Sequence, residues 1–380
     1  METRKLKEIR RAYGFDEVAI VPGSMTINPE QTSTEMKLGG LSFDIPILAS
    51  AMDAVVSPSF AICMDKLGGL AVMNLEGVQS RYDDPSEALT SIIKADPTEV
   101  TSVLQKVYSA PIKEELIGKR VEAIKATGSK CAISTTPQNT KRLAPIALEA
   151  GADILVVQST VTTARHASKS YKGLVFSELL ETVKVPVIVG NCVTYDVALE
   201  LMETGIDAIL IGVGPGAACT TREVVGVGIP QVTATLECSA AREEYYKRTG
   251  RYVAVITDGG IRTGGDLCKA IVSGADGVMI GTPMAQAKEA PGQGFNWGMA
   301  SPHPALPRGT RINVGLKGTL KEILFGPSSV TNGTMNLVNA LSICMGMVGA
   351  ADIRALQQAE MVVAPAIKTE GKIFQIAKSI

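Results

Sequence analysis

Residues 253–282 read VAVITDGGIRTGGDLCKAIVSGADGVMIGT and place two short apolar runs on either side of a helix-like segment. The runs are residues 253–258 and 277–281, and neither alternates apolar with polar residues. Such continuous runs are typical of strands that are covered on both faces. Residues 265–273 between them have a helical pattern, and Gly274 follows where a helix C-cap is expected. The stretch therefore predicts a β–α–β unit of a parallel sheet.

The same unit recurs toward the N-terminus. Six more apolar runs, each followed by a helix-like segment, lie at residues 45–50, 69–74, 131–135, 152–158, 185–190 and 208–213. Eight strand–helix units fit a closed barrel better than a doubly wound sheet, and about 250 residues are enough to build one. The sequence predicts an α/β fold, a (β/α)8 TIM barrel, that forms a single domain over residues 1–380.

Composition narrows the classes of function. The formal net charge is −1, so no overall field favours nucleic acid or an anionic membrane. The seven cysteines show no paired or metal-ligand spacing, which is typical of a reduced, intracellular protein. No signal-peptide pattern and no membrane-spanning apolar run is visible, so we expect a cytoplasmic protein. With only two histidines, His166 and His303, acid–base chemistry is not expected to depend on histidine.

Two connecting segments are longer than ordinary loops. Residues 81–125, between the second and third strands, are charged and mostly helix-like. Residues 288–319, after the eighth strand, are rich in glycine and proline. Because active sites of barrels are built from the loops that follow the strands, we interpret residues 288–319 as a functional flap.

A cysteine follows a Gly-Pro-Gly turn directly after the sixth strand. This segment, residues 212–231, reads GVGPGAACTTREVVGVGIPQ. Glycines allow a ligand to approach the backbone beside Cys219, and Thr220 and Thr221 provide hydroxyl groups. A free cysteine is more often a small buried core residue, but the flanking glycines favour a nucleophile here.

Glycine turns also end the last two strands. Asp258-Gly259-Gly260 follows the seventh strand, and Gly281-Thr282 follows the eighth. Backbone N–H groups at these two positions of a barrel commonly hold a phosphate group. Asp258 is placed to accept hydrogen bonds from ribose hydroxyls. Ordinary tight turns are the alternative interpretation.

These motifs together resemble one family. GPGxxCTTR, DGGIRTGGDLCKAI with GADGVMIGT, and SAMDAVVS at residues 50–57 are similar to the IMP dehydrogenase/GMP reductase family over nearly the whole chain. The resemblance is to the short "IMP dehydrogenase-related" subgroup that lacks CBS modules. It implies a (β/α)8 barrel that assembles as a homotetramer or octamer and binds GMP or IMP.

The resemblance also implies roles for individual residues. As catalytic residues it implies Cys219 as the nucleophile that forms a thioimidate at C2 of the purine, with Thr221 beside it and Arg308 at the family's acidic position. The implied substrate-binding residues are Ser50, Met52, Asn191, Gly216, Asp258, Gly259, Gly260, Gly281, Thr282, Gly298, Met299 and Ala300. The implied cofactor-binding residues are Gln158, Ser159, Gly212 and Gly214. A monovalent cation such as K+ is expected at the backbone of Gly214, Gly216 and Cys219, and Glu370-Gly371 is a further cation candidate across subunits.

Two reactions are known in the family. Dehydrogenases oxidise IMP to XMP with NAD, and they typically carry a CBS module after the second strand and an Arg-Tyr pair in the flap. Reductases convert GMP to IMP with NADPH. Residues 81–125 are too short for a CBS module, and MASPHPALPR at residues 299–308 lacks the Arg-Tyr pair. The sequence therefore favours an NADPH-dependent GMP reductase, with an NAD-dependent IMP dehydrogenase as the alternative.

Three positions depart from the family pattern. Ala217 replaces a phosphate-binding serine, Gln158 replaces an aspartate, and Arg308 replaces the glutamate of the reductases. Arginine stays protonated and cannot transfer protons as a carboxylate does. Two further alternatives therefore remain open: a catalytically silent nucleotide-binding barrel, and a flavin-dependent barrel without this cysteine chemistry.

Other features have plain interpretations. We expect His166 to be a surface or loop histidine and Trp297 to serve either in packing or in the site. The charged run at residues 242–251 is expected to be a solvated helix end.

Overall fold

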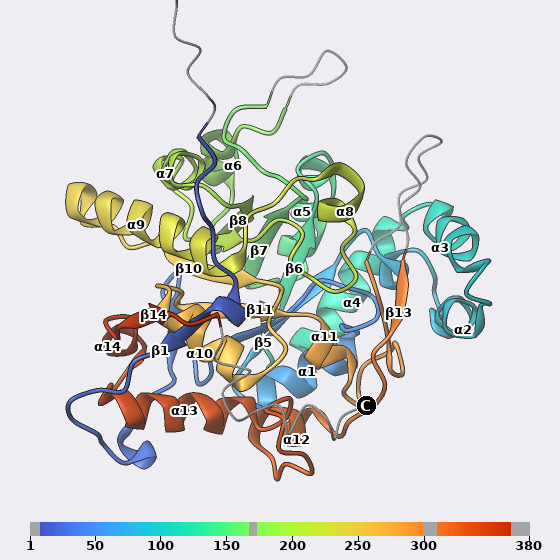
Figure 1. The fold of residues 1–380 in the computed structure, drawn as a ribbon. Helices are drawn as coiled ribbons and strands as arrows, with labels where there is room; N and C mark the ends of the chain where they lie inside the picture. The colour runs from blue at the N-terminus through green and yellow to red at the C-terminus, as the bar shows by residue number, and fades with distance from the viewer. Residues whose placement is uncertain (1–7, 167–172, 299–309, 366–380) are drawn as a thin grey trace, which may run out of the picture.

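The structure, a computed structural model, describes residues 8–166, 173–298 and 310–365. Its centre is a closed barrel of eight parallel strands in the order β10-β11-β4-β5-β6-β7-β8-β9 (Figure 1). The strands are β4 (Ile47–Ala49), β5 (Leu70–Asn74), β6 (Ala132–Thr135), β7 (Ile154–Gln158), β8 (Val187–Cys192), β9 (Ala208–Ile211), β10 (Ala254–Asp258) and β11 (Gly277–Ile280). Each coincides with one of the eight apolar runs, so the predicted barrel is confirmed.

Helices surround the barrel and connect its strands. They are α1 (Pro58–Lys66), α4 (Glu114–Lys125), α5 (Thr140–Glu149), α6 (Phe176–Thr182), α7 (Tyr195–Glu203), α9 (Gln231–Thr249) and α10 (Gly264–Val272). The sequence explains both ends of α10. The Thr263 hydroxyl accepts a hydrogen bond from the Asp266 N–H at 3.2 Å, and Gly274 just beyond the helix has φ +104°.

Both faces of the barrel strands are buried. Inward-facing residues such as Leu48, Val156 and Ile256 form one cluster inside the barrel, and their neighbours in the strands pack against the helices. The hairpin of β2 (Met36–Leu38) and β3 (Leu41–Phe43) contributes to the inner cluster. A Cβ at Gly277, which begins β11, would lie 2.4 Å from Met36 Sδ, so the hairpin closes the N-terminal end of the barrel. The opposite end remains available for a site.

Both long connections contain regular structure. Residues 81–125 hold α2 (Ser86–Lys94), α3 (Val100–Ser109) and α4, which confirms the predicted helical character. In the described part of residues 288–319, β12 (Phe295–Trp297) pairs antiparallel with β13 (Arg311–Asn313). The last helices are α11 (Thr282–Ala285), α12 (Leu320–Phe325), α13 (Leu337–Val348) and α14 (Ile353–Leu356).

Segments from both ends of the chain meet outside the barrel. Strand β1 (Val18–Ile20) pairs antiparallel with β14 (Met361–Val363). Three short 3-10 helices complete the elements: η1 (Phe15–Glu17), η2 (Pro29–Gln31) and η3 (Val78–Ser80). Within the described ranges, no helix has the length and apolar character needed to span a bilayer.

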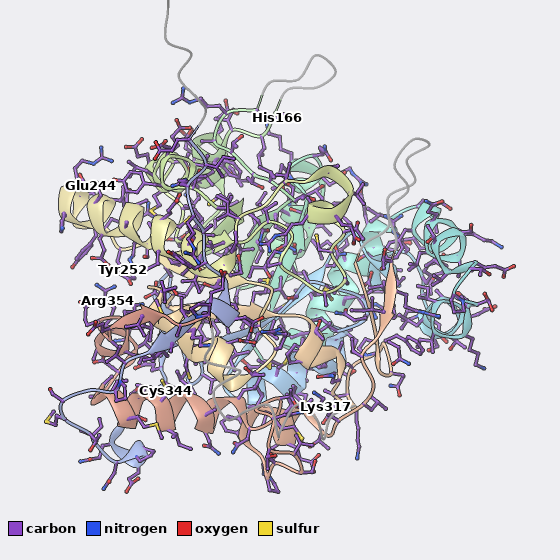
Figure 2. The ribbon with its side chains drawn as sticks, viewed as in Figure 1. His166, Glu244, Tyr252, Lys317, Cys344 and Arg354 are labelled. Atoms are coloured by element: carbon purple, nitrogen blue, oxygen red, sulfur yellow. The ribbon has the colours of Figure 1, made fainter. Side chains whose placement is uncertain are left out.

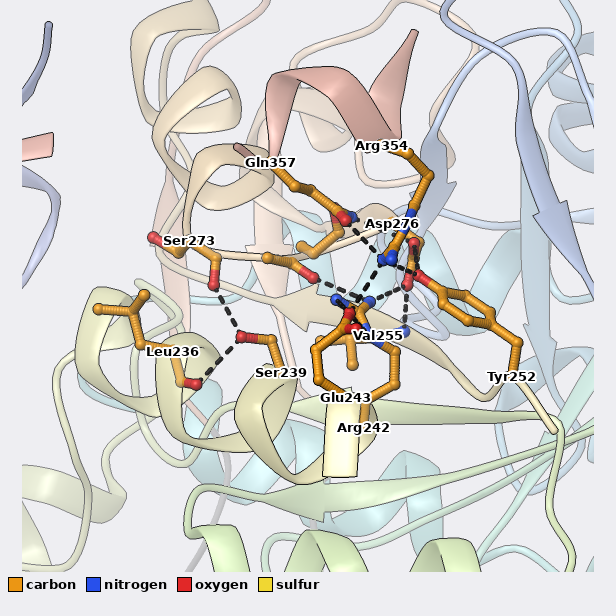
Figure 3. A network of polar contacts seen from close by, with 12 residues as sticks. Leu236, Ser239, Arg242, Glu243, Tyr252, Val255, Ser273, Asp276, Arg354 and Gln357 are labelled. Carbon is orange, nitrogen blue, oxygen red and sulfur yellow. Dashed lines mark hydrogen bonds and ion pairs between the residues drawn. The ribbon is translucent and has the colours of Figure 1, made fainter. Parts of the chain in front are cut away.

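The charged run at residues 242–251 is not wholly a solvated helix end. Arg242 is only 2% exposed and donates to Asp276 Oδ2 at 2.8 Å and to the Gly274 carbonyl at 3.1 Å (Figure 3). Tyr252 donates to the other Asp276 oxygen at 2.5 Å, and Arg354 of α14 donates to the Tyr252 hydroxyl at 2.8 Å. The prediction was wrong at Arg242 because this face of α9 turns inward, against the loop that precedes β11.

Candidate functional site

A cavity of about 1070 Å³ opens at the C-terminal end of the barrel. Every barrel strand contributes a residue at or directly after its C-terminal end: Ser50, Asn74, Thr135, Gln158, Asn191, Gly212, Asp258 and Gly281. This is the end at which barrel enzymes build their active sites. The fold therefore brings together loops that are far apart in the sequence.

Cys219 lies in the loop between β9 and α8 (Thr221–Val225) and is exposed to the cavity. Its N–H donates to the Gly216 carbonyl at 3.0 Å, and its Sγ donates to Thr221 Oγ1 at 3.3 Å. The predicted nucleophile and hydroxyl are thus neighbours in space. Solvent access is the property that distinguishes a reactive cysteine from a buried structural one.

Arg222 fixes the two ends of the Cys219 loop. Its guanidinium donates to the carbonyls of Val213, at 3.0 Å, and Ile229, at 2.6 Å. A Cβ at Gly214, where φ is +74°, would meet the Arg222 side chain at 2.5 Å, so the loop needs glycine there. Burial lowers the pKa of Arg222, and the charge on Cys219 acts in the opposite direction. The sequence analysis gave Arg222 no role, although it lies within the quoted motif.

The two glycine loops after β9 and β10 pack directly against each other. A Cβ at Gly259 would lie 3.1 Å from Pro215 Cγ and 3.3 Å from the Gly216 nitrogen. Gly259 and Gly260 have φ values of +83° and +79°, in the left-handed region that favours glycine. The predicted nucleophile loop and the predicted phosphate loop therefore form one continuous wall.

Gln231, at the start of α9, ties these loops to the strands. Its Nε2 donates to the carbonyls of Asp258, at 2.8 Å, and Ile211, at 3.1 Å, while its Oε1 is buried without a partner. The sequence analysis did not assign a role to this residue. The signal was its place directly after Gly-Ile-Pro at the start of a helix, where a polar residue is 3% exposed.

Asp258 meets Asn191 at the end of the barrel. Asn191 Nδ2 donates to Asp258 Oδ2 at 2.7 Å. Burial raises the pKa of Asp258 to about 6, and the hydrogen bond from Asn191 opposes that shift. Asp258 is thus a carboxylate at neutral pH whose second oxygen can accept a hydrogen bond from a ligand.

The wall next to β11 is formed by four predicted residues. A Cβ at Gly281 would lie 3.0 Å from Met52 Sδ and 3.6 Å from Ser50 Oγ. Thr282 Oγ1 accepts a hydrogen bond from Asn296 Nδ2 at 3.3 Å, and Asn296 Oδ1 is buried without a partner. Asn296 also lines the cavity and is a polar residue that the sequence analysis did not single out.

Two of the predicted cofactor residues, Gln158 and Ser159, lie at the end of β7 and line the cavity, whereas Gly212 and Gly214 lie in the loop after β9. Within the part of the chain that the structure describes, Gln158 Oε1 and Thr136 Oγ1 are buried atoms with no hydrogen-bond partner. Ser159 donates to the Val161 carbonyl at 2.8 Å. Gln158, Ser159 and Thr136 line the cavity with amide and hydroxyl groups, which can hydrogen-bond the carboxamide and hydroxyl groups of a dinucleotide, so these residues fit a nicotinamide cofactor.

Every predicted substrate, cofactor or catalytic residue that lies in the described ranges lines this one cavity. Met299, Ala300 and Arg308 lie outside those ranges, as does Glu370-Gly371. His166, which Figure 2 labels, is exposed and is also one of the residues that line the cavity. Among the described residues, no group of three His, Cys, Asp or Glu side chains is placed to hold a metal. The expected monovalent cation at backbone carbonyls stays a prediction.

Comparisons with known proteins agree with this geometry. A family model described as "IMP dehydrogenase / GMP reductase domain" matches residues 12–301. A protein of Mycolicibacterium smegmatis named "Uncharacterized oxidoreductase" is 38% identical over 93% of this chain and 97% of its own length. An inosine-5′-monophosphate dehydrogenase of Cryptosporidium parvum is 29% identical over 92% of this chain and 91% of its own length.

A solved structure is similar over almost the entire chain. The crystal structure of an IMP dehydrogenase/GMP reductase-like protein from Corynebacterium glutamicum has a TM-score of 0.89 and 34% identity. The match covers 96% of this chain and 97% of that chain.

Proposed function

The chain belongs to the IMP dehydrogenase/GMP reductase family, whose members bind purine nucleotides and use nicotinamide cofactors, and on this premise we propose that it is an oxidoreductase acting at C2 of a purine 5′-monophosphate. The observation that carries the proposal is the exposed Cys219. Its sulfur lies 3.3 Å from the Thr221 hydroxyl, in the cavity that also contains both glycine loops.

Different residues of the chain would bind the phosphate, the ribose and the cofactor. The N–H groups of Gly259, Gly260 and Gly281 would hold the phosphate, because left-handed or unhindered backbone lets an anion approach closely. Asp258 would accept hydrogen bonds from the ribose. Gln158 and Ser159 would contact the cofactor, which supplies the hydride acceptor or donor when bound.

Covalent chemistry would take place at Cys219. Its thiolate adds to C2 of the purine, so a carbon–sulfur bond forms and an electron pair moves onto a ring nitrogen. Thr221 is placed to pass on the thiol proton. In the oxidative direction, C2 would give its hydride to the nicotinamide of bound NAD. Water would then add to the thioimidate and lose a proton, and the sulfur would leave with its electron pair as XMP is released.

Of the two reactions, we propose the oxidation of IMP with NAD as the first candidate. The sequence favoured GMP reduction partly because residues 81–125 are too short for a CBS module. The named dehydrogenase of Cryptosporidium parvum matches over 91% of its own length, so shortness does not separate the two reactions. Arg308 in place of a glutamate also argues against reduction, since a guanidinium is a poor proton donor to departing ammonia. It could instead orient the attacking water.

GMP reduction with NADPH is the second candidate. One sequence feature favours it: residues 299–308 lack the Arg-Tyr pair expected in a dehydrogenase flap.

The test compares IMP plus NAD with GMP plus NADPH, using the native protein and Cys219→Ala. We expect nicotinamide absorbance to rise with IMP, and the variant to lose turnover by roughly 10³-fold or more because no covalent intermediate forms. Calorimetry should show that the variant still binds the nucleotide. Turnover that survives loss of the sulfur would contradict the proposal, and binding without turnover by the native protein would indicate a silent barrel.

A further inference from the structure

A separate hydrophobic cluster lies beside the barrel, between the α2–α3 insertion and the cavity rim. Its members are Ala54, Val78, Ala88, Leu89, Ile92, Val100, Leu104, Val107, Tyr108 and Trp297. They come from four parts of the chain: the segment after β4, the 3-10 helix η3 after β5, the insertion, and β12. The insertion therefore packs on two segments that lead directly into the cavity.

A chain of buried hydrogen bonds crosses this cluster. Trp297 Nε1 donates to the Tyr108 hydroxyl at 3.1 Å, and that hydroxyl donates to Asp53 Oδ2 at 2.7 Å. The same carboxylate oxygen accepts from the Val78 N–H at 3.1 Å. Trp297, Tyr108 and Asp53 are 0%, 4% and 2% exposed, so water does not replace these bonds in the folded protein.

Both bonded partners of Tyr108 are chain neighbours of cavity residues. Asp53 follows Met52, and Trp297 precedes Gly298, and both Met52 and Gly298 line the cavity. One hydroxyl of the insertion thus joins the two rim segments, which are more than 240 residues apart in the sequence.

A second contact ties the paired strand β13 to the insertion. Arg311 donates to the carbonyls of Ile92 and, at 2.7 Å, of Ile93, near the C-terminus of α2. A cation at this end of a helix is favourable. The guanidinium also lies 4.5 Å from the centre of the Phe295 ring of β12. Figure 1 shows β13 beside α2 and α3.

We propose that Tyr108 is a positioning residue for the reaction, whose hydroxyl sets the places of Met52 and Gly298 against the bound purine nucleotide. The inference rests on the proposed function, because it takes the cavity to be the nucleotide site. It assigns the α2–α3 insertion a role in catalysis without any contact between the insertion and the substrate.

The physical argument is the cost of a broken buried bond. Removal of the Tyr108 hydroxyl leaves the Trp297 N–H without an acceptor. It also removes one hydrogen-bond donor from Asp53, and a buried carboxylate is costly to keep ionised without such donors. The two rim segments then move apart to admit water. A displacement of about 1 Å at a binding surface is enough to reduce catalysis strongly.

Tyr108→Phe tests this, because it removes only the oxygen. Tyr82→Phe is the matched control: Tyr82 packs against the same cluster, but its hydroxyl donates to the Val107 carbonyl at 2.9 Å and holds no rim segment. Tyr108→Phe should lower the unfolding temperature more than Tyr82→Phe, because the Tyr108 hydroxyl forms two buried hydrogen bonds and the Tyr82 hydroxyl forms one. Only Tyr108→Phe should reduce kcat/KM, by roughly tenfold, with Tyr82→Phe within about twofold of the native enzyme.

Two further measurements separate this inference from the proposed function. Calorimetric affinity for IMP and GMP needs no turnover, and it should weaken in Tyr108→Phe but not in Tyr82→Phe. A double-mutant cycle with Trp297→Phe should be non-additive, since either change alone already breaks the bond. Equal kcat/KM and nucleotide affinity in the two tyrosine variants, or strict additivity in the cycle, would overturn the role of Tyr108 whatever the reaction catalysed.

Discussion

At Asp258, the ionised state that ligand binding would need is opposed by burial of the carboxyl group. For the proposed function it must stay ionised to accept hydrogen bonds from the ribose, yet burial raises its pKa to about 6. Because this value lies above the ordinary 3.8, the native protein takes up a proton before the unfolded chain does as the pH falls. The ionised form is therefore unfavourable for stability at neutral pH, and the penalty disappears between about pH 6 and pH 4.

We expect opposite effects on binding and stability. The KM for the nucleotide should rise as the pH falls through about 6, because the protonated carboxyl accepts weakly. Asp258→Asn should bind more weakly at pH 8, show a flatter KM profile, and unfold at a higher temperature than the native protein. Steady-state kinetics and thermal unfolding from pH 5 to pH 8 measure both. A steeper KM profile in the variant would contradict the assignment.

The pH experiment has an internal reference. Burial also raises the pKa of Asp53 to about 6, opposed by its hydrogen bonds to Tyr108 and Val78 and by the charge of Arg81. Asp53 is present in both proteins, so its contribution cancels when the two profiles are compared.

Some site residues could not be found from the sequence. Cys219, Asp258 and the glycine turns carry local signals, because each changes what the backbone or side chain can do by itself. Gln231 and Arg222 act by donating to carbonyls of loops that only the folded barrel brings near them. The contacts of Tyr108 could not be predicted for the same reason, since its hydrogen-bond partners Asp53 and Trp297 lie 55 and 189 positions away in the sequence.

Among the elements, α9 shows how a charged segment can be misinterpreted. A run such as residues 242–251 is usually solvated, but the helix presents Arg242 to Asp276 and Arg248 to solvent. Charge alone does not say which face of a helix turns inward. The Arg242 cluster lies at the N-terminal end of β10 and β11, where polar residues of a barrel serve stability rather than catalysis.

A matched pair of substitutions tests this distinction. Asp276→Asn removes the buried one of the two carboxylates that pair with Arg242, while Glu243 stays 2.9 Å from the guanidinium, and it should lower the free energy of unfolding by about 1.5–3 kcal/mol. Glu203→Gln removes the carboxylate that pairs with Arg248, which lies on α9 like Arg242. The side chains of Glu203 and Arg248 are both nearly half exposed, so the loss of this ion pair should lower the free energy of unfolding by less than about 1 kcal/mol. Denaturant unfolding gives both values. Neither change should alter KM, and a shifted KM in Asp276→Asn would show that the cluster influences the cavity.

For the whole molecule, the barrel could be predicted because its signal repeats. Each strand is a short apolar run such as residues 208–213, and each helix such as α10 ends at a glycine. The β2–β3 closure, the β1–β14 pair and the β12–β13 pair were not predicted. Their strands have only three residues each, which is too short for a periodic pattern, and long-range pairing fixes them.

The seven cysteines differ sharply in their accessibility. Cys131, Cys192, Cys238 and Cys268 are buried, Cys63 and Cys344 are half-buried, and Cys219 is exposed. Iodoacetamide should therefore modify one thiol per chain in a fast phase that Cys219→Ala abolishes and bound nucleotide slows. Cys344, whose pKa is lowered by its hydrogen bond with Cys268, should react second and without nucleotide protection. Mass spectrometry of the modified peptides gives the order, and fast labelling elsewhere would contradict it.

The same difference in exposure predicts which sulfur an oxidant meets first. Peroxide that diffuses to the barrel mouth meets the Cys219 sulfur before it can reach any sulfur of the core. If Cys219 is the nucleophile of the proposed function, mild oxidation should abolish turnover while the protein stays folded, and a thiol reductant should restore it.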